Sequence, residues 1–344
     1  PMGFPGSAMR IAAAALSGFF YPLAFAPFDL FWLAPVTIAV LFAGWAKASA
    51  RQAALQGFVF GLGMALAGVS WIYVSLSEFG NMPAPLAGGA VVIFAVLMAL
   101  YPTAVGLLQA HLRPASPAVR AVLVMPVLWV SGEWLRGNLM SGFPWLYLGY
   151  SQVDTPLAGL LPIVGTLGLS LWLALAVGAL VSLFYCVGRT RALPVGVLLG
   201  LWVCVALARM PVFVTPVGEP LNVALVQHNV SLSDKWHSHN ASNIANAYLQ
   251  DSEALSGADL IVWPEAALPA YLDEIAPAFL ARLEDHPADF LIGALARESL
   301  EPNAAYYNVA VGVGKARSLY RKHQLVPFGE YLPLSGLLAW LLDY

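Results

Sequence analysis

Residues 259–269 read DLIVWPEAALP, and residues 320–334 read YRKHQLVPFGEYLPL. The first stretch is an apolar run that ends at a proline and is followed by a carboxylate, Glu265. Such a run predicts a buried strand. The second stretch carries Lys322 and a further carboxylate, Glu330, in a loop between two prolines. Because ligands of α/β domains bind beyond the carboxyl ends of strands, Glu265 stands where a functional group is expected.

The sequence around these two stretches alternates strand-like and helix-like segments. Strands are predicted at 221–230, 258–265, 288–297 and 305–314, and helices at 243–255 and 276–284. Strands that are separated by helices predict an α/β domain in which the helices pack on a sheet.

The first 209 residues differ in composition from the rest. The whole chain is 60% hydrophobic and 10% charged, whereas soluble domains have about 45–50% apolar and about 25% charged residues. Residues 1–209 hold nine Lys/Arg and only four Asp/Glu, and residues 210–344 hold seven and fifteen. The net charge of −3 argues against a nucleic-acid partner. We therefore predict a transmembrane helical domain at 1–209 and a soluble domain at 210–344.

Seven apolar runs are predicted to cross the membrane, since about 20 apolar residues span the hydrocarbon core. They lie at about 10–27, 30–46, 54–77, 85–112, 119–136, 157–187 and 192–209. Basic residues gather at alternate connections, at Arg10, Lys47, Arg51, Arg113, Arg120, Arg189 and Arg191. The positive-inside rule then predicts a cytoplasmic N-terminus. Seven spans place the soluble domain on the outer face, which is the periplasm in a bacterium with two membranes.

Two features inside the apolar half stand out. Glu133 and Arg136 lie at i, i+3, where they are expected to pair on one helix face and to fix the depth of the helix. A functional role is the alternative, because ionisable groups in a membrane are costly. The segment 141–152, SGFPWLYLGYSQ, is either a re-entrant or interfacial element with a role in lipid contact, or an ordinary set of interfacial aromatic anchors.

Neither the cysteines nor the histidines predict a reactive centre. Cys186 and Cys204 both lie in apolar runs, so we expect small apolar side chains and neither a nucleophile nor a disulfide. His228, His237 and His239 are not followed by a carboxylate at metal-ligand spacing, and no metal site is predicted.

Five motifs together resemble the nitrilase, or carbon-nitrogen hydrolase, superfamily. They are QHN at 227–229, WPE at 263–265, FLIGA at 290–294, YYNVAV at 306–311 and RKHQLVPFGEYLP at 321–333. With the apolar runs before them, they make the chain similar to the membrane branch of that superfamily, the apolipoprotein N-acyltransferase family, over essentially all of its 344 residues. The resemblance implies a nitrilase-like αββα sandwich after the transmembrane helices.

The resemblance also implies roles for individual residues. Glu265 stands at the position of the general base, and Lys322 at the position of the lysine that stabilises the oxyanion of the tetrahedral intermediate. Glu330 matches a second glutamate that assists acylation and orients Lys322. Trp236, in SDKWH, resembles a tryptophan at the rim of the site that positions substrate.

The activity implied by the resemblance is the last step of bacterial lipoprotein maturation. A cysteine thiolate takes an acyl chain from a phospholipid, expected to be phosphatidylethanolamine, and forms a thioester. The acyl chain then passes to the N-terminal amine of an S-diacylglyceryl cysteine on an apolipoprotein. No cofactor is needed, and the implied location is the bacterial inner membrane.

The sequence departs from the family pattern in one respect. The family nucleophile lies on a strand-to-helix turn some tens of residues after Lys322, so we expect it, and the later strands of the sandwich, beyond residue 344. Two other functions stay open: a membrane-bound amidase of the same superfamily, and a non-catalytic protein that binds lipid or lipoprotein.

Overall fold

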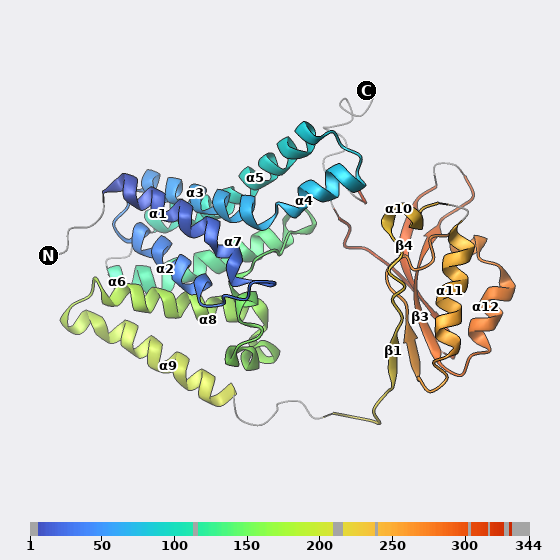
Figure 1. Ribbon diagram of the computed structural model, residues 1–344. Coiled ribbons are helices and arrows are strands. Elements are labelled where there is room, and N and C mark those ends of the chain that lie inside the picture. Colours follow the sequence, from blue (N-terminus) through green and yellow to red (C-terminus); the bar gives the residue numbers. More distant parts are fainter. Residues whose placement is uncertain are drawn as a thin grey trace. The chain divides into compact units, whose positions relative to one another are not determined.

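The computed structural model describes residues 6–112, 116–208, 216–237, 240–301, 304–315, 317–326 and 330–331. The chain forms two compact units, Pro1–Phe213 and Val214–Tyr344. The first unit is built from helices, and the second from a sheet with helices packed on it (Figure 1).

The described residues of the first unit form seven longer helices joined by short helical turns. The longer helices are α1 (Ser7–Phe20), α2 (Leu33–Ala46), α3 (Ala50–Gly68), α5 (Ala84–His111), α7 (Met125–Asn138), α8 (Leu161–Leu183) and α9 (Ala192–Ala208). The short elements are η1 (Tyr21–Ala24), α4 (Trp71–Val74), η2 (Ser75–Phe79), α6 (Pro117–Val119), η3 (Arg120–Val124), η4 (Leu139–Ser141), η5 (Leu148–Gln152), η6 (Pro156–Leu160) and η7 (Gly188–Arg191).

Several of these helices are long and apolar enough to cross a membrane. Among the described residues four stretches meet this test: Ala84–His111, Pro117–Ser141, Pro156–Leu183 and Gly188–Ala206. A fifth is added if Ala50–Gly68 and Trp71–Phe79, which meet at a bend of 49°, form one span. The prediction of a multi-pass membrane protein is therefore confirmed.

The first two predicted spans are short in the structure. They correspond to α1 and α2, and each helix has 14 residues. At about 1.5 Å per residue such a helix is about 21 Å long, against about 30 Å of hydrocarbon. Seven spans therefore remain a prediction.

Small residues let α3 and α5 approach closely. A Cβ on Gly57 would lie 2.2 Å from the carbonyl oxygen of Pro102, and a Cβ on Gly61 would lie 2.8 Å from Cα of Ala99. Glycines four residues apart on one face allow two helix backbones to come into contact, as is usual for helices in lipid.

The connection between α2 and α3 is closed by polar groups. The Ser49 hydroxyl accepts a hydrogen bond from the backbone N–H of Gln52, whose side chain accepts one from the Ser49 N–H. This capping box satisfies free donors at the start of α3. The buried Arg120 donates to the carbonyl oxygens of Trp45 and Ala46 at the end of α2. The polar backbone groups at both helix ends are thereby paired inside an apolar unit.

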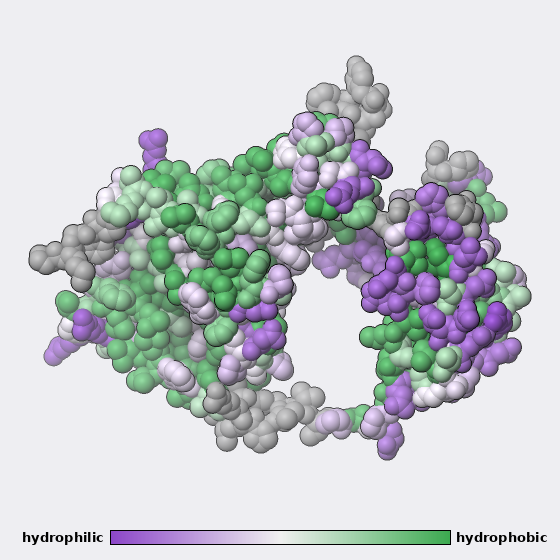
Figure 2. Space-filling model, viewed as in Figure 1, coloured by the Kyte–Doolittle hydropathy of each residue, from purple (hydrophilic) through white to green (hydrophobic). Residues whose placement is uncertain are grey.

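The outer surface of the first unit is apolar. Large hydrophobic side chains that a soluble protein would bury are exposed along the longest helix, including Leu86, Ile93 and Leu100. Figure 2 shows hydrophobic residues over much of the visible face of this unit, while hydrophilic residues dominate the visible face of the second unit. An apolar exterior is what lipid-facing helices require.

In the part of the second unit that the structure describes, five strands form a mixed sheet in the order β1-β2-β3-β4-β5. Its elements are β1 (Val223–Leu225), α10 (Leu232–Lys235), α11 (Ala241–Glu253), β2 (Leu260–Val262), η9 (Leu272–Glu274), α12 (Pro277–Glu284), β3 (Asp289–Arg297), β4 (Tyr306–Val313) and β5 (Ser318–Arg321). The first three strands run parallel, and β4 and β5 each pair antiparallel to the strand before. A helix connects each parallel pair, as parallel pairing demands.

One face of this sheet forms the core of the unit. Tyr248 and Leu249 of α11 and Leu283 of α12 are buried in one cluster with Ile261 and Phe290 of the strands. On β3, Phe290, Ile292 and Ala294 alternate with the half-exposed Leu291 and point to this core, because side chains alternate across a strand.

The structure changes two expectations about the sheet. Strand 221–230 is reduced to β1, because its only described partner, β2, offers three paired residues and the polar segment 227–229 follows. The strand β5 lies outside the four predicted strand ranges. A second sheet is not among the described residues, so the mixed sheet with its helices is established and the αββα sandwich remains a prediction.

Candidate active site

Glu265 lies just past the end of β2, at a turn held by Trp263. The backbone N–H of Trp263 donates to the carbonyl oxygen of Leu291 on β3 (2.9 Å), and its indole N–H donates to the Ser252 hydroxyl on α11 (3.0 Å). The ring is 2% exposed and packs 5.1 Å from the ring of Tyr248. The buried tryptophan therefore ties the strand end to both a neighbouring strand and the covering helix.

The turn that carries Glu265 lies directly against β3. A Cβ on Gly293 would be 2.2 Å from the carbonyl oxygen of Pro264 and 2.7 Å from Cα of Glu265. The next residue, Ala266, has a φ of +47°, a conformation that side chains other than glycine rarely adopt. Strained backbone of this kind is often found at functional sites, and here it accompanies a close approach that only glycine permits.

Lys322 follows the last residue of β5, an edge strand of the sheet, and its side chain reaches Glu265. Its backbone N–H donates to the carbonyl oxygen of Asn308 on β4 (2.9 Å), which continues the pairing of the two strands. Its ammonium lies 3.1 Å from Glu265 Oε1 and 3.0 Å from Glu330 Oε1. One cation thus bridges two carboxylates.

Glu330 is fixed by bonds to both of its oxygens. Oε2 accepts from the backbone N–H of Val326 (2.8 Å), and Oε1 accepts from Lys322 and from the amide of Asn308 (2.6 Å). The same Asn308 amide donates to Glu265 Oε1 at 3.2 Å. Asn308 therefore contacts both carboxylates that Lys322 contacts, and the four side chains form one hydrogen-bonded group.

This group shifts the pKa values of two of its members. Partial burial opposes the charge of the Lys322 ammonium, but the bonds to Glu330 and Glu265 outweigh it and raise the pKa of Lys322. Burial likewise favours the neutral form of Glu330, but the Val326 N–H and the bonds from Lys322 and Asn308 outweigh it and lower the pKa of that carboxyl. Lys322 is held as a cation and Glu330 as an anion.

The three charged side chains differ in exposure. The Glu265 side chain is 64% exposed, whereas those of Lys322 and Glu330 are 28% and 22% exposed. Glu265 Oε1 is engaged by Lys322 and Asn308, but Oε2 makes no hydrogen bond with any residue that the structure describes. One oxygen of Glu265 is thus oriented by its neighbours while the other is open to a reactant.

Two further residues lie beside Glu265. The Lys235 ammonium donates to the backbone carbonyl oxygen of Glu265 (3.3 Å) and lies 5.9 Å from the centre of the Trp236 ring. Burial lowers the pKa of Lys235, and the Glu265 carboxylate offsets part of that shift. Trp236 is 54% exposed at the end of α10. It therefore presents an open aromatic face next to the group of carboxylates.

The remaining candidates from the sequence lie elsewhere. His228 contacts Asp251 at 3.1 Å, and His239 is outside the described residues. No cluster of three potential metal ligands occurs in the part of the chain that the structure describes. Cys186, which is buried, and Cys204, which is exposed on α9, both belong to the helical unit.

The sequence predicted Glu265, Lys322, Glu330 and Trp236, and the structure brings the first three into direct contact. It did not single out Asn308 or Lys235. Asn308 carries a recognisable signal, because it is a polar residue in the middle of the apolar strand sequence YYNVAV. Lys235 has no such signal, since a lysine beside a tryptophan in a polar loop is common.

Comparisons with known proteins divide the chain in the same order. Residues 17–179 match the family model described as the apolipoprotein N-acyltransferase N-terminal domain, and residues 222–339 match the carbon-nitrogen hydrolase model. The second match contains every residue of the hydrogen-bonded group.

Curated relatives match nearly the whole chain. A protein from Methylococcus capsulatus is 39% identical over 334 residues, which are 96% of this chain and 66% of the relative. One from Azotobacter vinelandii is 38% identical, covering 99% of this chain and 67% of the relative, and one from Chromobacterium violaceum is 36% identical, covering 98% and 66%. All three bear the name apolipoprotein N-acyltransferase. The chain spans about two thirds of the length of these relatives.

Proposed function

Because the chain belongs to the apolipoprotein N-acyltransferase family, we propose that it transfers an acyl chain from a phospholipid to the N-terminal amine of a diacylglyceryl apolipoprotein. The observation that carries this proposal is the contact of Lys322 with Glu265 at 3.1 Å, beside an open Glu265 oxygen. It pairs a proton acceptor with a fixed cation, which acyl transfer through a tetrahedral intermediate requires.

In the first half-reaction Glu265 acts as the general base. Its Oε2 takes the proton of a cysteine thiol, and the resulting thiolate attacks the ester carbonyl of the phospholipid. The carbonyl oxygen becomes an oxyanion, which the Lys322 ammonium stabilises. The carbon–oxygen ester bond then breaks, and the glycerol oxygen leaves with the proton held by Glu265. The products are an enzyme thioester and a lysophospholipid.

In the second half-reaction the amine of the apolipoprotein attacks the thioester. Glu265 accepts a proton from the attacking nitrogen, Lys322 again stabilises the oxyanion, and the carbon–sulfur bond breaks. The thiolate that leaves recovers the proton, and the acyl chain ends in an amide. Splitting one difficult transfer into two steps of this kind is the advantage of covalent catalysis.

Glu330 and Asn308 hold the two reacting groups in place. Each contacts Lys322 or Glu265 without facing the open Glu265 oxygen. Glu330 keeps the ammonium charged and aimed, and Asn308 fixes the distance between the two carboxylates. Cys186 and Cys204 both belong to the helical unit and are not part of this hydrogen-bonded group.

The setting of the reaction is the bacterial inner membrane. The protein is a multi-pass membrane protein, and the basic connections of the helical domain, residues 1–209, support an N-terminus in the cytoplasm. Seven spans then place the soluble domain, residues 210–344, in the periplasm. Phosphatidylethanolamine is the proposed donor, and the sheet is one half of an αββα sandwich.

The test uses the protein as it is expressed from its own gene, purified in detergent with phosphatidylethanolamine and a diacylglyceryl lipopeptide. We expect N-acylated peptide and lysophospholipid in equal amounts, and a hydroxylamine-sensitive acyl adduct when the peptide is left out. Glu265→Gln should abolish the adduct. Lys322→Gln should slow its formation by about 10²- to 10³-fold, whereas Lys315→Gln, an exposed lysine in the β4–β5 turn, should not.

Three outcomes would reject the proposal. Release of free fatty acid in place of acylated peptide would indicate the amidase alternative. Unchanged turnover in Glu265→Gln would show that Glu265 is not the general base. Lipid binding without any acyl adduct would indicate the alternative of a non-catalytic lipid-binding protein.

A further inference from the structure

Residues 264–267 form the turn that carries the proposed base. The backbone N–H of Ala267 donates to the carbonyl oxygen of Pro264 (3.1 Å) and closes the turn. The third residue, Ala266, has a φ of +47°, whereas the second, Glu265, does not have a positive φ. These signs are those of a type II turn, whose third residue is usually glycine. The turn is therefore strained at Ala266, where a side chain stands in a conformation that favours glycine.

Rotation of one peptide group would relieve this strain. Types I and II differ in the orientation of the peptide that joins the second and third residues, and in type I the φ of the third residue is negative. In this protein that peptide joins Glu265 and Ala266. A type I turn would be the easier conformation for alanine, so contacts with the rest of the unit must favour the strained one.

One of these contacts is with β3. The Ala266 nitrogen lies 2.7 Å from the place of a Cβ on Gly293, so the nitrogen side of the peptide lies against this strand. After rotation the bulkier carbonyl oxygen of Glu265 would lie there instead. The turn would then have to move away from β3, and the Glu265 carboxylate would move with it.

Lys235 provides a second contact, on the carbonyl side of the same peptide. Its ammonium donates to the Glu265 carbonyl oxygen at 3.3 Å, and no other residue in the described ranges donates to that oxygen. The carbonyl and the N–H of a trans peptide point in opposite directions, so this peptide is held between β3 and Lys235. Rotation would break the bond and take this acceptor from a half-buried ammonium, which is costly.

The backbone of Lys235 is itself fixed. Lys235 ends α10, a single helical turn, and its N–H donates to the Ser231 carbonyl oxygen (3.0 Å). The Ser231 hydroxyl caps this turn by accepting from the Asp234 N–H (3.2 Å). The side-chain amide of Asn240 donates to the Asp234 carbonyl oxygen (3.0 Å). The ammonium therefore extends from a well-supported helical turn.

We infer that Lys235 is a positioning residue, whose ammonium holds the Glu265–Ala266 peptide in the orientation that brings the Glu265 carboxylate to Lys322. This inference rests on the proposed function, in which Glu265 is the general base. Lys235 acts on the backbone of the base, whereas the hydrogen-bonded group around Lys322 acts on its side chain. The two supports are separate, because the described hydrogen bond of the Lys235 ammonium goes to a backbone oxygen.

The first measurement is residue-resolved amide hydrogen exchange of the full protein in detergent, which needs no turnover. The Leu268 N–H donates to the Gly293 carbonyl oxygen (3.1 Å) and reports whether the turn lies against β3. In Lys235→Met, which keeps the apolar stem and removes the donor, exchange at Leu268 should be at least tenfold faster. Lys235→Arg keeps a donor and should exchange as the wild type does. The Trp263 N–H, which lies before the turn, should not change in either variant and so excludes general unfolding.

The second measurement is steady-state acyl transfer. In Lys235→Met, kcat should fall at least tenfold, with KM for the phospholipid within about threefold of the wild type, since a misplaced base slows chemistry and leaves binding intact. Lys235→Arg should restore kcat to within about threefold. Lys315→Met, at an exposed lysine in the β4–β5 turn, should change neither constant. If the wild type forms no acyl adduct, the proposed function fails, but the exchange measurement still decides whether Lys235 holds the turn.

Three results would overturn the inference. The first is wild-type exchange at Leu268 in Lys235→Met, or in Lys235→Ala if the methionine variant does not fold. The second is a rise in KM with kcat unchanged, which would show that the lysine contacts substrate and does not position the base. The third is a loss of kcat in Lys235→Arg equal to that in Lys235→Met, which would show that the donated hydrogen bond is not what places Glu265.

Discussion

The Lys322 ammonium lies 3.1 Å from the Glu265 carboxylate, although 57 positions of sequence separate the two residues. The sheet explains the contact. Glu265 follows β2, Lys322 follows β5, and between those strands Asn308 of β4 reaches both Glu265 and Glu330. Because three separate segments meet at one point, a change in the sheet is expected to affect the site without touching any charged group.

Gly293 on β3 is a position in the sheet where such a change can be made. In Gly293→Ala the new methyl group would meet the Pro264 carbonyl oxygen at 2.2 Å, so the turn that carries Glu265 must move. We expect acyl-enzyme formation to fall by more than about 100-fold, since misplacement by about 1 Å is enough for such a loss. Overpacking should destabilise the protein by about 1–3 kcal/mol. Single-turnover adduct formation and thermal unfolding measure the two effects.

Gly257→Ala is the matched control, because a Cβ there meets nothing within 4 Å. It should change neither rate nor stability. Wild-type adduct formation in a folded Gly293→Ala would show that the position of Glu265 does not depend on this contact.

Asn308 allows a test of the hydrogen-bonded group without removing a charge. Asn308→Leu removes the donor to Glu265 and Glu330, and we expect kcat to fall about 10-fold with little change in KM, because Lys322 still holds both carboxylates. Asn308→Asp places a third carboxylate beside these two and should cost about 10-fold more through repulsion. Asn243→Asp, which adds the same charge to an exposed position of α11, should have no effect. A larger loss in the Leu variant than in the Asp variant would contradict this account.

Glu330 predicts a pH dependence of stability. Its pKa is lowered in the folded protein, so its ionised form stabilises the fold above its unfolded-state pKa, and this contribution is lost as the pH falls through the folded-state pKa. At pH 7 the free energy of unfolding of the wild type should be about 1–2 kcal/mol higher than that of Glu330→Gln. The difference should narrow below about pH 4.3. Unfolding followed by tryptophan fluorescence at several pH values measures it.

The control for this prediction is Glu219→Gln, since Glu219 is exposed and makes no described hydrogen bond. It should follow the wild-type curve. A gap between wild type and Glu330→Gln that stays constant down to pH 3 would show that ionisation of Glu330 does not stabilise the fold.

The sequence predicted those elements whose signal is local. Long runs of Val, Leu and Ala define α5 and α8, and the apolar runs of 258–265 and 288–297 define β2 and β3. The lengths of α1 and α2 were harder to predict, because the residue at which an apolar helix ends depends on its packing against neighbouring helices. The strand β5 has only four residues, all exposed, and pairing with β4 creates it.

The same distinction holds for the site. Glu265, Lys322 and Glu330 could be identified because each stands in a distinctive motif. Asn308 stands out in the sequence only as a polar residue within an apolar strand, and its contact with both carboxylates arises only when β4 lies between the segments that carry them.

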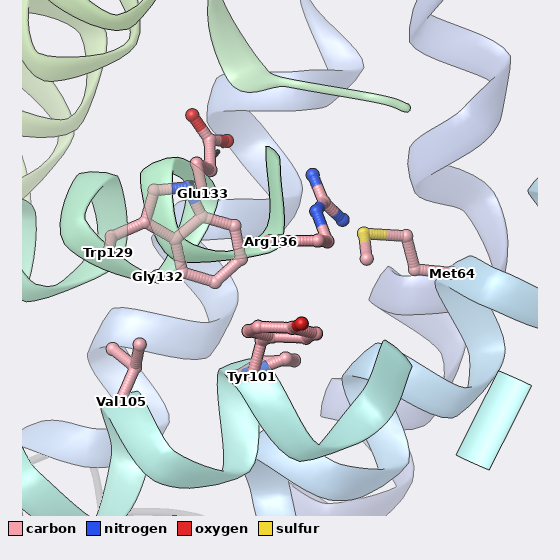
Figure 3. A pocket seen from close by; sticks show the side chains of 8 residues that line it. Met64, Tyr101, Val105, Trp129, Gly132, Glu133 and Arg136 are labelled. Atoms are coloured by element: carbon pink, nitrogen blue, oxygen red, sulfur yellow. Dashed lines mark hydrogen bonds between the residues drawn. The ribbon is translucent and has the colours of Figure 1, made fainter. Parts of the chain in front are cut away.

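The surroundings of Glu133 were equally hard to predict. Helical spacing places Glu133 and Arg136 on one face, and both line a small pocket of the helical unit (Figure 3). In the described part of the chain, however, no ion pair joins them, and Glu133 Oε1 accepts hydrogen bonds from Trp129 and the Leu148 N–H.

Trp236 is the predicted residue that the hydrogen-bonded group does not include. Its ring is 54% exposed beside Lys235, whose ammonium is bonded to the Glu265 backbone. An exposed indole at this place offers an apolar face to a lipid chain and no group that takes part in proton transfer. Its contribution should therefore appear in binding and not in chemistry.

In Trp236→Ala we expect KM for the phospholipid to rise about tenfold, equivalent to about 1.4 kcal/mol of lost apolar contact, with kcat within about threefold of the wild type. Trp236→Phe keeps an aromatic face and should recover most of the affinity. Trp202→Ala removes an even more exposed indole, 72% against 54% for Trp236, from α9 of the helical unit and should leave both constants unchanged. If Trp236→Ala lowers kcat and leaves KM as it was, the tryptophan supports the reacting groups, and its assignment to substrate binding is wrong.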